Sequence, residues 1–418
     1  MPIVLFEDEL ATQLYPITVG RAAFQISCGS FRLIDLVEMV NAESCLPPIA
    51  LRVRSHLRTV CAADRMESSS IGPAGAAEPT LLVNARLTPR AQLIGQLKEV
   101  LAAGRPCKVE SSEGMALALL PAGVELPAED AGPAALSALV AAHNLPTAEL
   151  DLPMFAYPHD VVRQNLSILS ENLRHRLATQ TYREIADGIF AAEGATLGQY
   201  VVADTRKGPI VLEKGATVGP YCFLSGPAHL GQGARVIEHA AIKDNVSLGH
   251  TTKIGGEIEG SVIEPYTNKQ HHGFLGHSYL GSWVNLGAGT CNSDLKNTYG
   301  QVNMEYLGRK VATGMQFIGT IVGDYSKTAI NTGIFTGKTI GACSMVYGFV
   351  TTNVPSFVNY ARLFGQVTEA PAEVMVATQA RMFARRNVTQ RPCDIQLIHD
   401  MYELTRHERQ LAGEPLSL

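Results

Sequence analysis

Aliphatic residues recur every six positions through the middle of the chain, eight times without a break. Neither an amphipathic helix nor a single alternating strand requires this spacing. A six-residue period is typical of a parallel β-helix, in which each unit forms one side of a coil and its aliphatic side chain points inward. The pattern therefore predicts a solenoid over residues 208–350. Its aliphatic positions are Leu212, Val218, Leu224, Leu230, Val236, Ile242, Leu248 and Ile254.

Glycine supports the same interpretation. Well over half of the 38 glycines lie in the predicted solenoid, and several of them directly follow an aliphatic position. Glycine fits the corners of a coil, where a side chain would crowd the neighbouring backbone. The period breaks near residues 257–273 and 291–316, so we expect loops that leave the coil there. Loops on a rigid scaffold are frequent places for function.

The sequence before the solenoid alternates between short apolar runs and amphipathic stretches. Strands are predicted at residues 3–6 and 81–83, and helices at 31–40 and 89–102. This mixture indicates an α/β domain. We assign it to residues 1–155.

Two further segments are expected to be helical. Apolar positions three or four residues apart predict a linker helix within residues 156–192. The solenoid domain would then occupy residues 193–360. Two helices are expected in the C-terminal segment, residues 361–418, where they would cover the end of the solenoid.

Composition excludes several classes of protein. The chain has 418 residues, of which 46% are hydrophobic and 17% charged, so it is globular rather than disordered. Its net charge of −5 gives no cation excess for nucleic acid. No apolar run is long enough for a membrane span, and the start lacks a basic signal region, so we expect a cytoplasmic protein. The eight cysteines form no CxxC pair, and no metal site is expected.

The sharpest chemical constellation lies where the chain re-enters the predicted solenoid. It comprises Asn268-Lys269-Gln270-His271-His272-Gly273-Phe274-Leu275-Gly276, followed by Asn285-Leu286-Gly287-Ala288-Gly289-Thr290-Cys291-Asn292. Neighbouring coils could present a base, a cation and amide groups together. Transfer of an acyl group from a thioester to an amine needs such parts, because a base of near-neutral pKa takes the amine proton and N–H donors stabilise the oxyanion.

These motifs resemble a bifunctional bacterial family, the N-acetylglucosamine-1-phosphate uridyltransferase/glucosamine-1-phosphate acetyltransferases. The opening residues and the Asn268-Lys269-Gln270-His271 run resemble more closely its branch of sugar nucleotidyltransferases. The resemblance implies a nucleotidyltransferase-like α/β domain and a left-handed parallel β-helix. It also implies a homotrimer with acetyl-transfer sites between subunits, acetyl-CoA as acyl donor, and a place in the synthesis of UDP-N-acetylglucosamine for the cell envelope.

The resemblance also implies roles for individual residues of the solenoid. His271 matches the acetyl-transfer base, and Asn285 matches a substrate-contacting asparagine. For the phosphate of the substrate it implies Lys243. Glu259 or Ser261 stands where the family has a phosphate-binding lysine, and we expect Lys269 to compensate. For acetyl-CoA it implies Ala288 and Asn292, and Lys296 is a further candidate. Phe274 stands where the family has a tyrosine, so one hydroxyl is missing.

The first domain departs further from the pattern. The run Thr12-Gln13-Leu14-Tyr15-Pro16-Ile17-Thr18 resembles a signature of sugar-nucleotide transferases, but the glycine-rich turn before it is replaced. The resemblance implies Asp8, Arg21 and Asn84 as nucleotide-site residues, with Mg²⁺ if this domain is active. Asn84 stands where the family has a metal-binding aspartate, and an acidic turn would repel a triphosphate in the absence of Mg²⁺.

Three hypotheses follow. The first is transfer of an acetyl group to an amino-sugar phosphate or a nucleotide sugar in the solenoid domain. The second is Mg²⁺-dependent nucleotidyl transfer from UTP or dTTP by the first domain. The third is a non-catalytic trimeric scaffold that binds a sugar nucleotide. All three expect a small-molecule ligand and neither nucleic acid nor membrane as partner.

Overall fold

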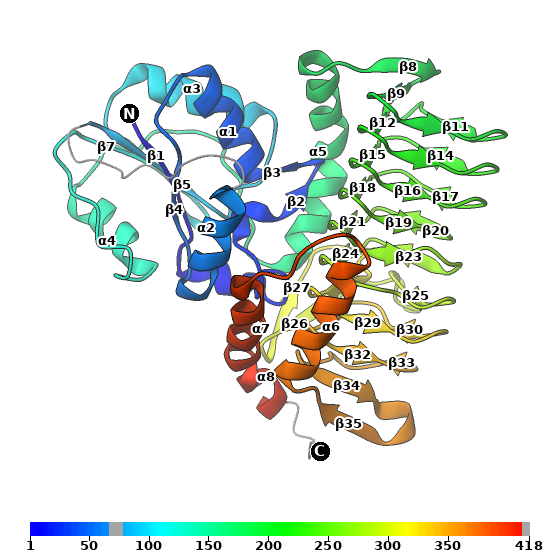
Figure 1. Cartoon of the computed structure of the whole chain (residues 1–418). Coiled ribbons are helices and arrows are strands. Elements are labelled where there is room, and N and C mark those ends of the chain that lie inside the picture. The colour runs from blue at the N-terminus through cyan, green and yellow to red at the C-terminus, as the bar shows by residue number, and fades with distance from the viewer. Residues whose placement is uncertain (67–77, 412–418) are drawn as a thin grey trace.

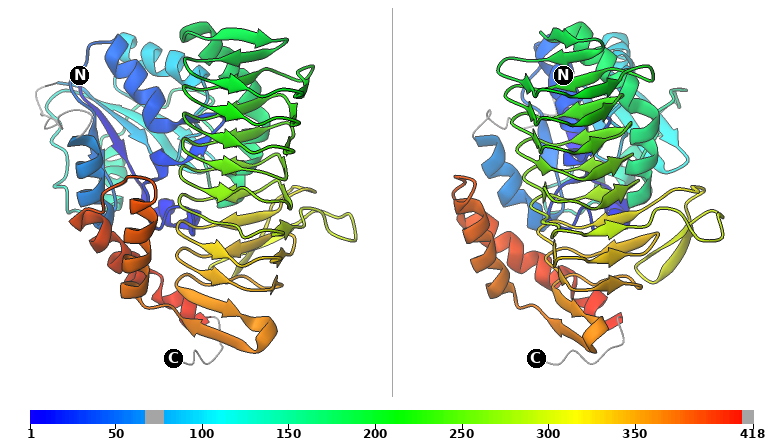
Figure 2. Two further views of the ribbon diagram at one scale, coloured as in Figure 1. Left: turned by 45° about the vertical axis from the view of Figure 1, so that its right-hand side comes forward. Right: turned by 90° about the vertical axis from the view of Figure 1, so that its right-hand side faces the viewer.

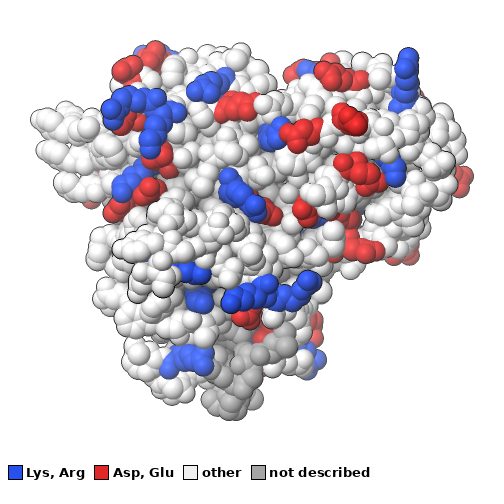
Figure 3. Space-filling view, turned by 180° about the vertical axis from the view of Figure 1, so that it is seen from behind, with Lys and Arg blue, Asp and Glu red and all other residues white. Residues whose placement is uncertain are grey.

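The computed structural model describes residues 1–66 and 78–411. An α/β domain lies beside a long solenoid, and C-terminal helices pack where the two meet (Figure 1). On the face seen from behind, basic and acidic side chains lie interspersed (Figure 3). Within the described residues, no helix is long and apolar enough to cross a membrane.

The first domain is built on a five-stranded sheet of order β4-β1-β5-β7-β6, in which β1 is parallel to β4 and β5. The predicted strands and helices of this domain are confirmed. The sheet strands are β1 (Ile3–Phe6), β4 (Ala50–Arg52), β5 (Thr80–Asn84), β6 (Cys107–Ser111) and β7 (Gly114–Leu120), with a hairpin of β2 (Ser27–Cys28) and β3 (Phe31–Arg32). The helices are α1 (Leu33–Glu43), α2 (Arg58–Met66), α3 (Gln92–Ala103) and α4 (Ala134–Ala142).

Helix α5 (Pro158–Thr179) joins the two domains and lies within the segment expected to link them. Its buried Leu169 and Leu173 pack against Val211 of the solenoid. Its other face reaches the first domain, because the side-chain amide of Asn172 donates to the carbonyls of Gly29 and Pro89 at 2.8 and 2.9 Å. The helix is therefore part of both interfaces.

The solenoid winds three six-residue units into each regular coil of 18 residues. Leu212 pairs with Leu230, and Leu230 pairs with Leu248, so every third aliphatic position stacks on one face. All eight aliphatic positions of the repeat are buried. Figure 2 shows the stacked coils end to end. The predicted parallel β-helix is thus confirmed, and its three-sided coil is of the left-handed β-helix type.

Three columns of short parallel strands make the three faces of this solenoid. The first face contains β8 (Arg183–Ala186), β9 (Ile189–Ala191), β12 (Ile210–Leu212), β15 (Ala228–Leu230), β18 (Val246–Leu248), β21 (Val262–Ile263), β24 (Tyr279–Leu280), β28 (Thr320–Val322) and β31 (Lys338–Ile340). The second face contains β10 (Thr196–Leu197), β13 (Thr217–Val218), β16 (Arg235–Val236), β19 (Lys253–Ile254), β22 (Asn268–Lys269), β29 (Lys327–Thr328) and β32 (Met345–Val346). The third face contains β11 (Val202–Asp204), β14 (Phe223–Ser225), β17 (Ala241–Ile242), β20 (Glu257–Glu259), β23 (Phe274–Gly276), β25 (Cys291–Asn292), β30 (Gly333–Ile334) and β33 (Phe349–Val350).

One loop leaves the coil as a hairpin, in the stretch where the period breaks. Its strands are β26 (Asn303–Tyr306) and β27 (Arg309–Ala312). Tyr306 of this hairpin stacks on Tyr157 and His159 at the start of α5, with ring centroids 5.6 and 5.7 Å apart. The hairpin is therefore packed against the linker between the domains.

The C-terminal helices do not cover the end of the solenoid, contrary to expectation. The last coil is closed by the hairpin of β34 (Val358–Ala361) and β35 (Gln366–Glu369), because β34 pairs with β32 and continues the second face. The helices α6 (Ala372–Ala384), α7 (Pro392–Leu404) and α8 (Arg406–Leu411) pack along the side instead. Phe383 of α6 lies on Trp283 of the solenoid at 4.6 Å, and α7 contacts α2 of the first domain.

Candidate functional site

The predicted nucleotide site of the first domain is occupied by a closed ion-pair network. Arg86 donates to both carboxylate oxygens of Asp8, at 2.8 and 2.6 Å, and the side-chain amide of Asn84 donates to the same carboxylate at 2.8 Å. All three residues are buried. Beside them, Arg54 binds both carboxylate oxygens of Glu7. The turn that the family fills with glycine is therefore held shut by two arginine–carboxylate pairs.

This network does not fit a magnesium ion. Mg²⁺ takes carboxylate oxygens as ligands, and both oxygens of Asp8 already accept hydrogen bonds from protein donors. A cavity of about 310 Å³ borders Asp8, with Lys108 and Glu110 also in its wall. The sequence analysis missed Arg86. Its position two residues after Asn84, at the end of a buried strand, was the available indication.

Arg21 lies apart from the other two predicted nucleotide-site residues. Its guanidinium pairs with Asp324 and lies 3.1 Å from a carboxylate oxygen of Glu264, both in the solenoid. The three side chains are buried where the first domain packs on the coils. Arg21 therefore joins the domains, and this placement corrects its expected role beside Asp8 and Asn84.

The predicted acetyl-transfer residues meet at the corner between the second and third faces. His271 and His272 are exposed there, between β22 and β23. The coil before contributes Gly255 and Gly256 to this corner, and the coil after contributes residues 287–289. We call these residues the histidine corner. Glycine is required by the packing, because a Cβ on Gly255 would meet the carbonyl oxygen of Gln270 at 2.2 Å.

Unpaired backbone donors line the histidine corner. The N–H groups of His271, His272 and Ala288 make no hydrogen bond with any described residue. Among the described residues, the imidazole of His271 has one neighbour of hydrogen-bonding type, the side-chain amide of Gln270 at 3.5 Å. The corner thus combines an exposed imidazole with free N–H donors, the two groups that acyl transfer to an amine requires.

Lys269 occupies an inward position of the coil. It pairs in register with Ile254 and is 2% exposed, so an ammonium stands where the repeat places an aliphatic side chain. The ammonium donates to the carbonyls of Gly255 and His271, at 3.0 and 2.6 Å. Lys269 therefore supports the backbone of the histidine corner from inside. This corrects its predicted role as a phosphate ligand.

Burial lowers the pKa of Lys269 to about 8, because desolvation disfavours its charged form. An unfolded lysine has a pKa near 10.4, so between these values the unfolded chain binds more protons. We therefore expect the free-energy cost of burying the charged form of Lys269 to disappear as the pH rises from about 8 to about 10. Relative to Lys269→Met, the wild type should gain about 3 kcal/mol of unfolding free energy over that range. Urea denaturation of both proteins at several pH values measures this difference. If the unfolding free energies of the two proteins changed in parallel with pH, the prediction would be wrong.

Lys243 also fails to match its predicted role. Its ammonium pairs with Glu257 at 2.5 Å and with Glu259 at 3.5 Å on the third face. These carboxylates raise the pKa of Lys243, with the hydrogen bond to Glu257 as the largest cause. A phosphate at this position would face both carboxylates. Lys243 is thus a partner of two glutamates rather than an open anion ligand.

Asn285 lies outward on the second face, between Asn268 and Lys327 of the adjacent coils. Its carbonyl oxygen accepts a hydrogen bond from the amide of Asn268 at 2.7 Å. Within the described chain, its own amide nitrogen has no hydrogen-bond partner. It remains a candidate for substrate contact.

The three residues predicted to contact acetyl-CoA are in different environments. Ala288 lies in the histidine corner and is partly exposed. Asn292 is buried inside the coil, where its amide binds the N–H and carbonyl groups of Gly276 at 2.9 and 3.0 Å. Lys296 donates to the carbonyl of Gln301 within the same loop. The interior position of Asn292 corrects its expected contact with the acyl donor.

The sequence analysis also missed a histidine–carboxylate pair. His277 is partly buried, and its Nδ1 lies 2.8 Å from a carboxylate oxygen of Asp294. This pair attaches the start of the loop that contains β26 and β27 to the coil that precedes it. An aspartate that begins a break in the repeat was the available indication.

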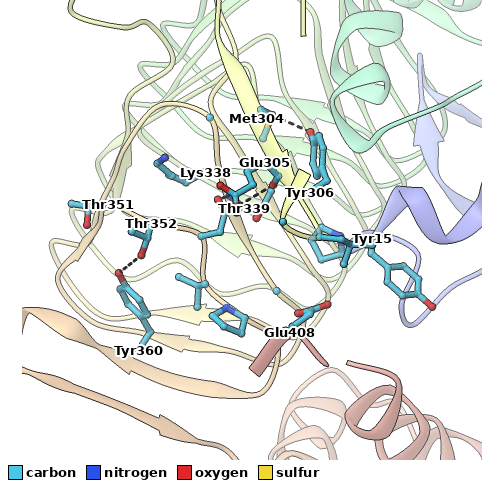
Figure 4. A pocket seen from close by; sticks show the side chains of 18 of the residues that line it. Tyr15, Met304, Glu305, Tyr306, Lys338, Thr339, Thr351, Thr352, Tyr360 and Glu408 are labelled. Carbon is cyan, nitrogen blue, oxygen red and sulfur yellow. Dashed lines mark hydrogen bonds between the residues drawn. The ribbon is translucent and has the colours of Figure 1, made fainter. Parts of the chain in front are cut away.

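A larger cavity lies away from the histidine corner. It has a volume of about 590 Å³ and is enclosed by the β26–β27 hairpin, the last coils, α8 and the Tyr15-Pro16 turn (Figure 4). Glu408 in its wall accepts a hydrogen bond from the backbone N–H of Ser356, and burial raises the pKa of Glu408. The hydroxyls of Thr352 and Tyr360 bond to each other at 3.2 Å. None of the predicted site residues lines this cavity.

The α/β domain followed by a β-solenoid is a two-domain architecture with a nucleotidyltransferase-like first part. A family model described as sugar nucleotidyl transferase matches residues 3–179, which confirms the predicted resemblance. The chain is 28% identical over 149 residues to a "Bifunctional sugar-1-phosphate nucleotidylyltransferase/acetyltransferase" of Sulfurisphaera tokodaii, covering 35% of this chain and 37% of that protein. It is 31% identical over 144 residues to "Bifunctional protein GlmU" of Methanococcus vannielii, covering 34% of each. The chain therefore spans about a third of the length of these relatives.

Two solved structures also align. The UDP-N-acetylglucosamine acyltransferase of Francisella novicida does so with a TM-score of 0.35 and 15% identity, over 56% of this chain and 79% of that one. The polySia-specific acetyltransferase NeuO gives a TM-score of 0.25 and 14% identity, over 48% and 99%.

Proposed function

We propose that the protein is a transferase that moves an acetyl group from acetyl-CoA to the amine of an amino-sugar phosphate or a nucleotide sugar. The observation that carries this proposal is the histidine corner, where the exposed imidazole of His271 lies beside unpaired backbone N–H groups. The relative from Sulfurisphaera tokodaii, whose name includes an acetyltransferase, supports the same chemistry.

In the proposed reaction the neutral amine nitrogen of the sugar attacks the thioester carbonyl, and the imidazole of His271 takes the proton of that nitrogen as the N–C bond forms. The N–H groups at the corner stabilise the oxyanion that forms. Each such donor contributes about 3 kcal/mol to the transition state in comparable sites. The C–S bond breaks, and the leaving thiolate takes the proton from the imidazolium. Asn285 would orient the sugar, and Ala288 would leave room for the acyl donor.

A neighbouring copy of the chain would complete this site. Helix α5 packs on the first face, and α6 packs on the second. The third face instead exposes apolar side chains, among them Val202 and Phe349, which are 62% and 54% exposed. Large exposed apolar areas mark sites of association. This supports a homotrimer in which the third face meets another copy beside the histidine corner.

Nucleotidyl transfer by the first domain is the alternative that the family match favours. The Arg86–Asp8 pair opposes it, because it occupies the turn where a triphosphate would bind. One experiment separates the two functions. The whole chain is incubated with acetyl-CoA and a panel of amino-sugar phosphates and nucleotide sugars, and thiol release is followed. A parallel series contains UTP or dTTP with Mg²⁺, and pyrophosphate release is followed. Thiol release without pyrophosphate is expected, and the reverse result would contradict the proposal.

A further inference from the structure

Four cationic side chains gather on the second face of the solenoid, beside the C-terminal end of α6. Arg235 and Lys253 are direct register partners on β16 and β19, so their side chains leave the same face one coil apart. Arg385 and Arg386 follow the last turn of α6. Phe383 in that last turn lies on Trp283 of the solenoid, with ring centroids 4.6 Å apart, so the two arginines that follow it lie beside the coils. Their charges also act on Lys253. We call them the cation cluster.

The cation cluster has no anionic partner in the described part of the chain. None of the four side chains makes an ion pair or hydrogen bond there. Like charges directly opposite on neighbouring strands repel each other. Burial and the neighbouring arginines accordingly lower the pKa of Lys253, and the pKa of Arg386 is lowered by burial and then by Arg385. The positive charge of the cation cluster is therefore not balanced by nearby acidic groups, although the chain as a whole has a net charge of −5.

The cation cluster shares its face with the candidate substrate residues. Lys253 pairs in register with Asn268, and Asn268 is bridged to Asn285 in the next coil. Each coil advances by about 4.8 Å, so one small molecule can extend from Lys253 to Asn285. The histidine corner borders this face, because His271 lies two residues after the end of β22. An aromatic column flanks the opposite side, where Tyr266 stacks on Trp283 at 4.1 Å.

We propose that the cation cluster binds the phosphate of the acceptor, an amino sugar that carries a phosphomonoester or a diphosphate. This inference rests on the proposed function and names the phosphate subsite of the same site. It assigns to Arg235, Lys253, Arg385 and Arg386 the task that the sequence assigned to Lys243 and Lys269. Arginine and lysine bind phosphate through charge-assisted hydrogen bonds, and these four side chains have no partner among the residues that the structure describes. The sugar would then lie over Asn268 and Asn285, with its amine toward His271.

Direct binding tests the subsite without any turnover. Isothermal titration of the whole chain with inorganic phosphate and with pyrophosphate is compared for the wild type and Arg235→Gln/Lys253→Gln. The matched control is Arg174→Gln/Arg183→Gln, which removes two exposed cations on α5 and β8 that have no partner among the described side chains. We expect pyrophosphate binding about tenfold weaker or worse in the first variant and unchanged in the control. No binding by the wild type, or equal loss in both variants, would overturn the subsite.

Kinetics then separate this inference from the proposed function. In acetyl transfer, Arg235→Gln/Lys253→Gln and Arg385→Gln/Arg386→Gln should each raise KM for the phosphorylated acceptor about tenfold and leave kcat nearly unchanged. KM for acetyl-CoA should not change. Unchanged KM for the acceptor in both variants would overturn the assignment. If pyrophosphate binding depends on the cluster but no acetyl transfer occurs, the subsite holds and the proposed function fails.

Discussion

Replacement of His271 by alanine is expected to lower kcat for acetyl transfer by about 10²- to 10⁴-fold, the usual contribution of a general base. The imidazole is exposed at the histidine corner and has no described carboxylate partner that would hold it in a structural role. The KM values should change little, because binding groups are untouched. The measurement is steady-state thiol release over a range of acceptor concentrations.

His272→Ala is the matched control for that prediction. Its side chain lies one residue away in the same loop, on the side of Gly289 and Asn331. It should retain kcat within a few-fold, and the thermal stability of both variants should equal that of the wild type. If the His271→Ala protein kept full activity, or if the His272→Ala protein lost it, His271 would not be the general base.

Replacement of Arg21 by methionine is expected to lower the free energy of unfolding by about 3–5 kcal/mol, because it leaves Asp324 and Glu264 buried and unpaired. Both carboxylates lie where the first domain packs on the solenoid. Desolvation by burial already raises the pKa of Asp324, with Arg21 acting in the opposite direction. Urea denaturation followed by circular dichroism measures the loss.

Arg206→Met provides the control for this stability prediction. Arg206 pairs with Asp204 but its side chain is 88% exposed, so solvent screens the pair and its removal should leave the unfolding free energy unchanged within the error of the measurement. Adding Asp324→Asn to Arg21→Met should restore part of the loss, since it removes one of the two uncompensated charges. Equal stability of Arg21→Met and the wild type would show that the pair does not hold the domains together.

The fold could be predicted where the repeat is regular. From Leu212 to Ile254 each side chain repeats its environment one coil later, so spacing alone defines the three faces. The next coil is shorter, because Ile254 pairs with Lys269, 15 residues on. Because this coil is three residues shorter than the regular one, the register shifts, and the pairing of Lys269 with Ile254 places Lys269 in the interior. Asn292 enters the interior in the same way, opposite Ile334. Sequence spacing cannot show such a change when the inward residue is polar.

The candidate site could be predicted only in part for a related reason. His271 and Ala288 are positioned by local motifs at one corner, and the structure brings them together there. The partner of Asp8 lies 78 residues away in the same domain, and it is brought close by the pairing of β1 with β5. The partner of Arg21 lies 303 residues away, and only the packing of the first domain on the solenoid brings that pair together. The cation cluster likewise contains residues from two distant parts of the chain, the solenoid and the end of α6. Its members carry no motif, so the sequence analysis did not find them.

The most direct test of the central claim identifies the product in a single mixture. The whole chain is incubated with ¹³C-labelled acetyl-CoA, UTP, Mg²⁺ and glucosamine 1-phosphate, and with UDP-glucosamine as a second acceptor. Mass spectrometry then follows each sugar for the wild type, His271→Ala and His272→Ala. The account predicts a labelled acetyl group on the sugar nitrogen that forms with the wild type and His272→Ala and is lost with His271→Ala. A sugar that gains uridylyl and no acetyl, equally in all three proteins, would contradict it.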